Sequence, residues 1–91
     1  MKDKQKFGPC TLQSYMDSWI LQIPLNLFSK LKAEKVAGDQ VLLVKEIFIR
    51  VMGHEPWSTE HDDDLFSIEF PRDTTDNKII QFVDLLHQSS S

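Results

Sequence analysis

The stretch DDDLFSIEFPRDTTDNKIIQFVDLL, residues 62–86, begins with three bare carboxylates, passes through a proline and ends in an apolar stripe. The stripe repeats at three- and four-residue steps, the period of an amphipathic helix with one buried face. The sequence DTTD at residues 73–76 is a variant of the capping box, in which a cap residue is followed three positions later by an acid. We therefore expect a last helix to start there. Its inward residues are expected to be Ile79, Ile80, Phe82, Val83 and Leu86.

The residues upstream of this stretch also carry helical patterns. In residues 11–23, TLQSYMDSWILQI, the apolar positions recur at helical spacing, and a proline then disfavours continuation of the helix. Residues 25–35, LNLFSKLKAEK, predict a second, short helix. Residues 40–52, QVLLVKEIFIRVM, predict the most buried helix, with Asp39 as its N-cap and Gly53 at its C-terminal end.

Residues 54–61 predict a loop, and residues 62–68 predict a single helical turn. The expected fold is therefore all-α, a small five-helix bundle in which Trp19, Leu42 and Phe82 share one core. The expected organisation is a flexible leader at 1–10, a single helical domain at 11–88 and a disordered tail at 89–91.

Length and composition exclude several classes of protein. With 91 residues and 41% apolar content, the chain has room for one modest core. The longest apolar run, VLLV, falls far short of the ~18 residues of a membrane span. No apolar segment follows the charged start MKDKQK, so we expect no signal peptide and a cytoplasmic or nuclear location. Cys10 is the single cysteine, which excludes an internal disulfide and a cysteine-rich zinc site.

The net charge of −4 is unevenly distributed along the chain. Residues 54–76 carry eight acids and one base, a net charge of −7, which leaves +3 for the rest. An acidic face of this kind repels phosphate backbones and attracts basic protein surfaces. We therefore expect a protein partner with a basic surface and argue against nucleic acid.

The acidic stretch has no pattern typical of a metal or catalytic site. Residues 62–64 with His54 and His61 lack the alternating ligands and glycine of an EF-hand and the histidine spacing of a helical zinc site. Cys10 has no histidine or arginine nearby in the sequence to lower its thiol pKa. No phosphate-binding loop or nucleophile elbow is present either. We expect no enzyme, no metal and no cofactor.

Four segments together resemble the sterile alpha motif (SAM) domain family. WILQIPL at 19–25 is similar to the end of the first SAM helix, and KVAGDQVLLV at 35–44 to the central Gly-Asp segment. DDDLFSIEF at 62–70 resembles the fourth helix, and KIIQFVDLL at 78–86 resembles the long fifth helix. This alignment implies an insertion at 45–61 between the third and fourth helices.

The resemblance implies a protein-protein interaction module, an adaptor or scaffold that docks onto a partner domain through complementary surfaces. Another SAM domain is one candidate partner, and a homo-oligomer is another. Trp57 lies in the predicted loop, where it either covers a groove or is presented to a partner. The candidate partner-binding residues are Trp57, Glu60, Asp62, Asp63, Asp64 and Glu69, together with Asp73, Asp76, Asn77 and Lys78 at the start of the last helix.

Two other functions are open at this stage. The chain could be a helical subunit of an obligate homo- or hetero-oligomeric assembly, in which a partner covers the broad apolar face of residues 41–52. It could also bind RNA hairpins, as some SAM domains do, although its acidic balance argues against this.

Overall fold

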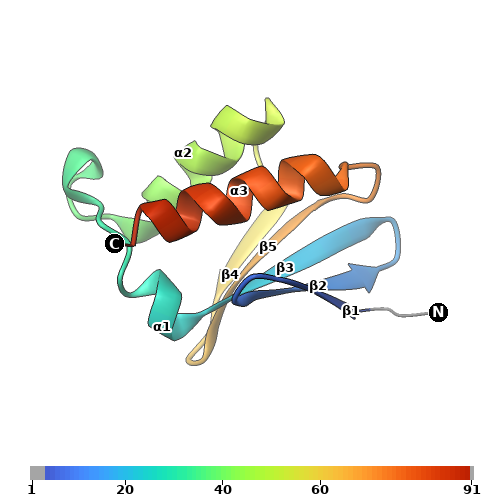
Figure 1. Ribbon diagram of the computed structural model, residues 1–91, viewed down its shortest axis with the longest axis horizontal. Coiled ribbons are helices and arrows are strands. Elements are labelled where there is room, and N and C mark those ends of the chain that lie inside the picture. The colour runs from blue at the N-terminus through green and yellow to red at the C-terminus, as the bar shows by residue number, and fades with distance from the viewer. Residues whose placement is uncertain (1–3, 91) are drawn as a thin grey trace.

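A five-stranded antiparallel sheet with helices on one face forms the fold (Figure 1). The computed structural model describes residues 4–90, so what we expected of residues 1–3 and 91 lies outside the described part. The strand order is β1-β2-β3-β5-β4. Helices α2 and α3 lie side by side over the sheet. In chain order the elements are β1 Lys4–Phe7, β2 Cys10–Tyr15, β3 Ser18–Pro24, α1 Leu25–Phe28, η1 Glu34–Val36, α2 Gln40–Met52, β4 Ser58–His61, β5 Leu65–Pro71 and α3 Asp76–Gln88.

The prediction of an all-α five-helix bundle is wrong, and the resemblance to SAM domains falls with it. Residues 11–23 form most of the β2–β3 hairpin instead of a first helix. On β3 the side chains of Trp19, Leu21 and Ile23 alternate toward the helices, with Leu21 and Ile23 fully buried. The strands are joined by a two-residue turn at Met16 and Asp17, and Met16 has a φ of 52°.

The acidic stretch forms a hairpin where a helical turn was expected. Residues 65–71 are strand β5, in which Phe66, Ile68 and Phe70 are buried and alternate with half-buried residues. This is the period of a strand with one face on the core. Part of the predicted loop at 54–61 is strand β4, which pairs with β5 along its whole length.

The two long helices were predicted correctly. Helix α2 has the expected N-cap, since the Asp39 carboxylate accepts a hydrogen bond from the Leu42 N–H at 3.1 Å. It ends at Gly53, whose φ of 85° is the left-handed conformation that glycine adopts at low cost. Helix α3 also forms, but its N-cap is Thr75 rather than the start of DTTD. The predicted second helix shortens to α1 and a separate 3-10 turn.

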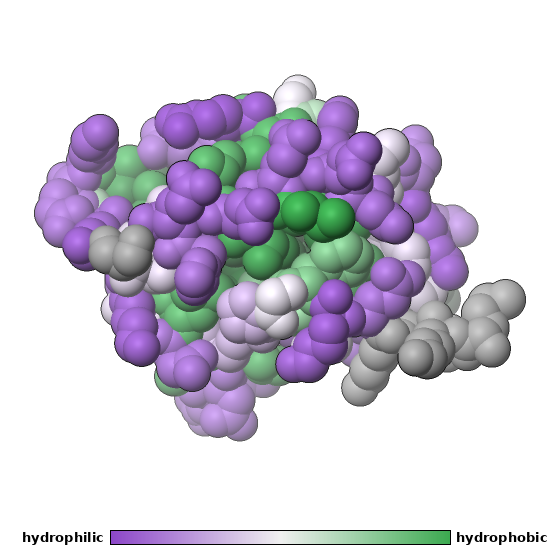
Figure 2. Space-filling view, viewed as in Figure 1, coloured by the Kyte–Doolittle hydropathy of each residue, from purple (hydrophilic) through white to green (hydrophobic). Residues whose placement is uncertain are grey.

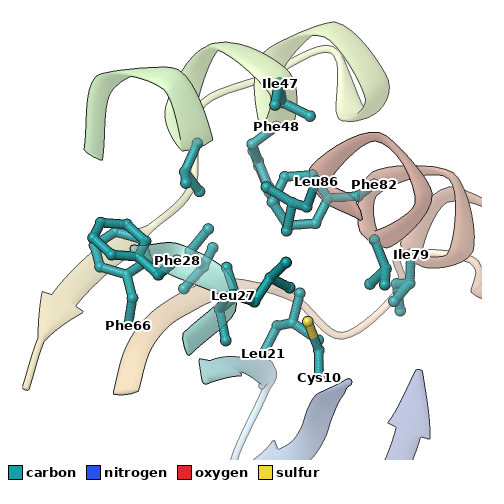
Figure 3. Packing of buried hydrophobic residues seen from close by; sticks show 14 of the residues in the cluster. Cys10, Leu21, Leu27, Phe28, Ile47, Phe48, Phe66, Ile79, Phe82 and Leu86 are labelled. Atoms are coloured by element: carbon teal, nitrogen blue, oxygen red, sulfur yellow. The ribbon is translucent and has the colours of Figure 1, made fainter. Parts of the chain in front are cut away.

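The core lies between the sheet and the helices, and aromatic rings fill its centre (Figure 3). The Phe48 ring contacts the rings of Phe70 and Phe82 at centroid distances of 5.7 and 5.5 Å. Phe82 is fully buried as predicted, and Trp19 packs against the core as a half-buried residue. Leu42, predicted in the core, is instead 44% exposed on α2.

The amino-terminal segment joins the sheet. Residues 4–7 form edge strand β1, and Cys10, which starts β2, is fully buried. The expected domain start at Thr11 therefore falls inside β2. At the other end the backbone carbonyl of Ser89 accepts a hydrogen bond from the Lys32 N–H at 2.8 Å, which connects the end of α3 to the segment after α1.

Candidate protein-interaction surface

The β4–β5 hairpin presents three consecutive carboxylates at its tip. The tip, residues 62–64, is exposed and lies at the bottom of the view in Figures 1 and 2. The Asp62 N–H donates to the Leu65 carbonyl at 2.8 Å, and the Asp64 carbonyl accepts from the Leu25 N–H at 3.1 Å. The tip is therefore held by the backbone of both its own hairpin and the start of α1.

An apolar patch lies beside these carboxylates. Leu25 is 37% exposed and lines a shallow hollow with His61, Asp62 and Asp63. The His61 ring packs on the rings of Phe28 and Phe66, at centroid distances of 5.1 and 5.9 Å. These contacts fix the end of β4 to the core. The hollow combines an apolar contact with negative charge, the features that suit an amphipathic basic side chain.

Glu69 has a different role from the one expected of it. It is half-buried on the face of the sheet without helices, and its two carboxylate oxygens accept hydrogen bonds from Ser18 Oγ at 2.6 Å and Ser58 Oγ at 2.9 Å. These bonds connect β3, β5 and β4. Glu69 therefore serves to join strands, whereas Glu60, two residues before the tip, is exposed and has no such partner.

Trp57, just before β4, is 56% exposed, so it is presented to solvent rather than buried over a groove. Its backbone N–H donates to the Glu69 carbonyl at 2.8 Å, although Glu69 already pairs with Ser58. Two residues opposite one is the arrangement of a β-bulge, which redirects side chains at sheet edges. Trp57 lines a second hollow together with Lys45, Glu55 and Pro56.

The remaining candidates lie at the opposite end of the hairpin. Asp73, Asp76, Asn77 and Lys78 are all exposed around the start of α3. Strand β5 separates them from the tip, and its seven residues span roughly 20 Å. The Thr75 hydroxyl caps α3 by accepting from the Lys78 N–H at 3.4 Å. The ten predicted residues therefore do not form one surface: Glu60 and the tip residues lie at one end of the hairpin, these four lie at the start of α3, and Trp57 and Glu69 belong to neither group.

No metal-binding arrangement is found in residues 4–90. No group of three or more histidine, cysteine or acidic side chains in this range could hold a metal ion. Burial raises the pKa of the Cys10 thiol to about 12, against a smaller lowering by the nearby Lys6 charge, so the thiol is protonated at neutral pH. None of the described helices is both long and apolar enough to cross a bilayer.

Two exposed features were missed by the sequence analysis. The β1–β2 turn and α3 enclose an apolar groove of about 550 Å³, part of which shows as green surface in the middle of Figure 2. Ile80, assigned to the core from its spacing, is 45% exposed at this groove. At the β2–β3 turn, Tyr15 and Met16 are 51% and 78% exposed. No residue pattern in the sequence indicates the groove or the exposed turn, because both depend on which strands and helices pack together in the fold.

Comparisons with known proteins assign the chain to no family. No family model, curated protein or solved structure matches the chain. The function is therefore argued from the surface geometry alone.

Proposed function

We propose that this domain is a protein-interaction module that binds a basic partner through one end of the β4–β5 hairpin. The binding surface, called the hairpin surface below, consists of Leu25, Glu60, Asp62, Asp63 and Asp64. The observation that carries the proposal is the cluster of four exposed carboxylates beside an exposed leucine on a backbone-braced turn. Charges of one sign in such a cluster raise the local concentration of an oppositely charged partner and speed its association.

The surrounding contacts leave this charge available for a partner. Among residues 4–90, no lysine or arginine forms an ion pair with these carboxylates. The side chain of Asp62 accepts only from the neighbouring Asp63 N–H, at 2.6 Å. A bound lysine or arginine would therefore gain a carboxylate partner without first breaking an internal ion pair.

Neutralisation of the tip tests the proposal. The triple variant Asp62→Asn, Asp63→Asn, Asp64→Asn should lower affinity for a lysine-rich peptide on the order of tenfold or more, as measured by fluorescence anisotropy at ~0.05 M salt. The matched control Asp17→Asn, Asp73→Asn, Asp84→Asn removes the same charge from exposed sites elsewhere and should retain most of the affinity.

Salt provides the second measurement. Wild-type affinity should fall as salt rises from ~0.05 M to ~0.5 M, because the Debye length shrinks about threefold over this range. If both triple variants bind alike, or if wild-type affinity does not depend on salt, the hairpin surface is not the docking site.

A second candidate function is that of a subunit in a larger assembly. Leu42 and Ile49, seven residues apart on α2, are 44% and 40% exposed and form a short apolar stripe that the charged residues Lys45 and Glu46 interrupt. This stripe is small beside the roughly 800 Å² per partner that a stable interface buries. Size-exclusion chromatography with light scattering distinguishes the two functions, because a concentration-independent monomer contradicts an obligate homo-oligomer.

A further inference from the structure

Strand β4 has one edge without a strand partner. It is the last strand of the sheet and pairs only with β5. The Asp62 N–H bonds to the Leu65 carbonyl, and in an antiparallel pair such bonds recur at every second residue. The backbone groups of Ser58 and Glu60 therefore face β5, whereas those of Thr59 and His61 point outward. An outward row of free N–H and C=O groups is a template for a further strand.

Hollows lie beside β4 on both faces of the sheet. On the side covered by helices, one hollow of about 240 Å³ lies at Trp57 and another of about 380 Å³ lies at His61. On the open side of the sheet, a hollow of about 270 Å³ begins at Ser58 and Glu60 of β4 and extends over the sheet as far as Gln13 of β2. Successive side chains of a strand point to opposite faces, so an added strand would direct them alternately to the two sides.

The charges beside this edge favour a basic strand as its partner. Two of the three hollows contain carboxylates and no lysine or arginine: Asp62 and Asp63 beside His61, and Glu60 and Glu69 on the open side. In the hollow at Trp57, Lys45 lies with Glu55, so its formal charges balance. Like charges that face each other across strands are destabilising, so the β4 edge of a second copy is disfavoured. A basic strand would instead meet carboxylates at the His61 hollow on the helix side and at the hollow on the open side.

We propose that β4 accepts an extended, basic segment of a partner protein as a sixth strand. This inference rests on the proposed function and deepens it, because it specifies the conformation of the partner at the hairpin surface. Backbone hydrogen bonds to Thr59 and His61 provide the attachment. Carboxylates on the face that the partner's alternate side chains enter then favour lysine or arginine at those alternate positions.

Backbone methylation of the ligand tests strand addition directly. The probe is a short peptide that alternates lysine and valine, prepared unmodified and in two N-methylated forms, one methylated at the lysines and one at the valines. A strand donates N–H groups to one side from one of these sets only. We expect one methylated form to lose affinity tenfold or more and the other to bind nearly as well as the unmodified peptide.

A proline on the protein side provides the complementary test. Thr59→Pro removes an outward N–H without removing a bond to β5, a position at which edge strands tolerate proline. This variant should fold, as checked by circular dichroism and thermal unfolding, and should lose peptide affinity tenfold or more. Thr59→Ala keeps the N–H and should bind like the wild type. On peptide binding, hydrogen exchange at the Thr59 and His61 amides should slow.

The outcomes separate the inference from the function on which it rests. If both methylated peptides bind as tightly as the unmodified one while the Asp62–Asp64 asparagine variant still weakens binding, strand addition is wrong and the acidic docking surface stands. If no lysine-rich peptide binds at low salt, both are wrong. If the protein self-associates and Thr59→Pro abolishes this, a second copy occupies the edge and the basic-partner proposal is overturned.

Discussion

The two hairpins of the sheet end in tips of contrasting construction. The β2–β3 tip carries exposed Tyr15 and Met16, and Arg72 braces it through a 2.7 Å hydrogen bond from Nη1 to the Met16 carbonyl. The β4–β5 tip carries only carboxylates, and its bracing comes from backbone hydrogen bonds. In the first hairpin a cationic side chain is used to hold a turn. In the second the charged side chains are left free for solvent or for a partner.

The position of each hairpin in the sheet explains this difference. Strand β3 is paired on both sides, with β2 and β5, so its hairpin contributes to stability along its whole length. Strand β4 is at the edge, and three of its four residues are exposed. We therefore expect substitutions in the β2–β3 hairpin to change the free energy of unfolding, and substitutions at the hairpin surface to change binding.

The largest expected effect is that of Leu21→Ala in the centre of β3. Leu21 is fully buried, so the substitution should lower the free energy of unfolding by about 2–5 kcal/mol, through lost burial and a new cavity. Leu25→Ala, at the hairpin surface, is the matched control. It should lower the free energy of unfolding much less than Leu21→Ala does, because Leu25 is 37% exposed. Urea unfolding measures the free energy of unfolding of both variants. Equal decreases would contradict the proposed difference between the two hairpins.

Removal of the Arg72 side chain, which holds the β2–β3 turn, should have the next largest effect on the free energy of unfolding. Arg72 also lies over the Trp19 ring, 5.0 Å from its centroid, and the Trp19 Nε1–H donates to the Arg72 carbonyl. Arg72→Ala should destabilise the protein by about 1–2 kcal/mol, because one hydrogen bond to a charged group and one cation–π contact are lost. Lys78→Ala removes an exposed positive charge elsewhere and should change stability by less than about 0.5 kcal/mol.

The buried thiol at the start of β2 predicts a comparable effect of pH. The pKa of Cys10 is raised to about 12 from an ordinary value of 9.0, so the unfolded thiol ionises first as pH rises. Stability contributed by the protonated thiol is complete below pH 9 and is lost as pH rises toward 12. From pH 8 to pH 10 the loss should be about 1 kcal/mol in the wild type.

The Cys10→Ala variant isolates this contribution. Below pH 9 it should be less stable than the wild type, but it should lack this part of the pH dependence, so the difference in the free energy of unfolding should narrow as pH rises, as measured by urea unfolding. Parallel curves for variant and wild type would contradict a buried, protonated thiol.

The smallest expected effect is a gain in stability at the β2–β3 turn. Met16 adopts a φ of 52°, a conformation that costs a residue with a side chain about 1 kcal/mol or more. Met16→Gly should therefore raise the free energy of unfolding by about 0.5–1 kcal/mol, after the greater flexibility of glycine in the unfolded chain is counted. Asp17 has no positive φ, and Asp17→Gly should give no gain.

The helices were predictable because their signals are local. Helix α2 has thirteen residues, a capping Asp39 and a terminal Gly53, and all three signals are visible in the sequence. Strand β2 and strand β3 were missed because the Met16–Asp17 turn has neither the Asn-Gly or Asp-Gly pair nor the first-position glycine that marks a two-residue hairpin. Without that signal, the strand alternation through Trp19, Leu21 and Ile23 was obscured by apolar residues that happen to recur at helical spacing.

The candidate surface was predictable in its charge but not in its geometry. The acidic bias of residues 54–76 predicted one acidic face; seven of its eight carboxylates are exposed and Glu69 is half-buried, but they do not lie together on one surface. That Glu69 is held by two serines, and that Asp73 lies a strand's length from Asp64, follows from long-range pairing of strands. The free edge of β4 was equally hidden, because the predicted loop at 54–61 concealed the strand.

The most direct test of a binding hairpin at the sheet edge is a nuclear magnetic resonance titration of the protein with the lysine–valine peptide. Amide shifts should change at residues 57–65 and at Leu25, with little change at Tyr15, Met16 or the groove beside Ile80. Shift changes centred on that groove or on the β2–β3 turn would place the docking site elsewhere and contradict the contrast between the two hairpins.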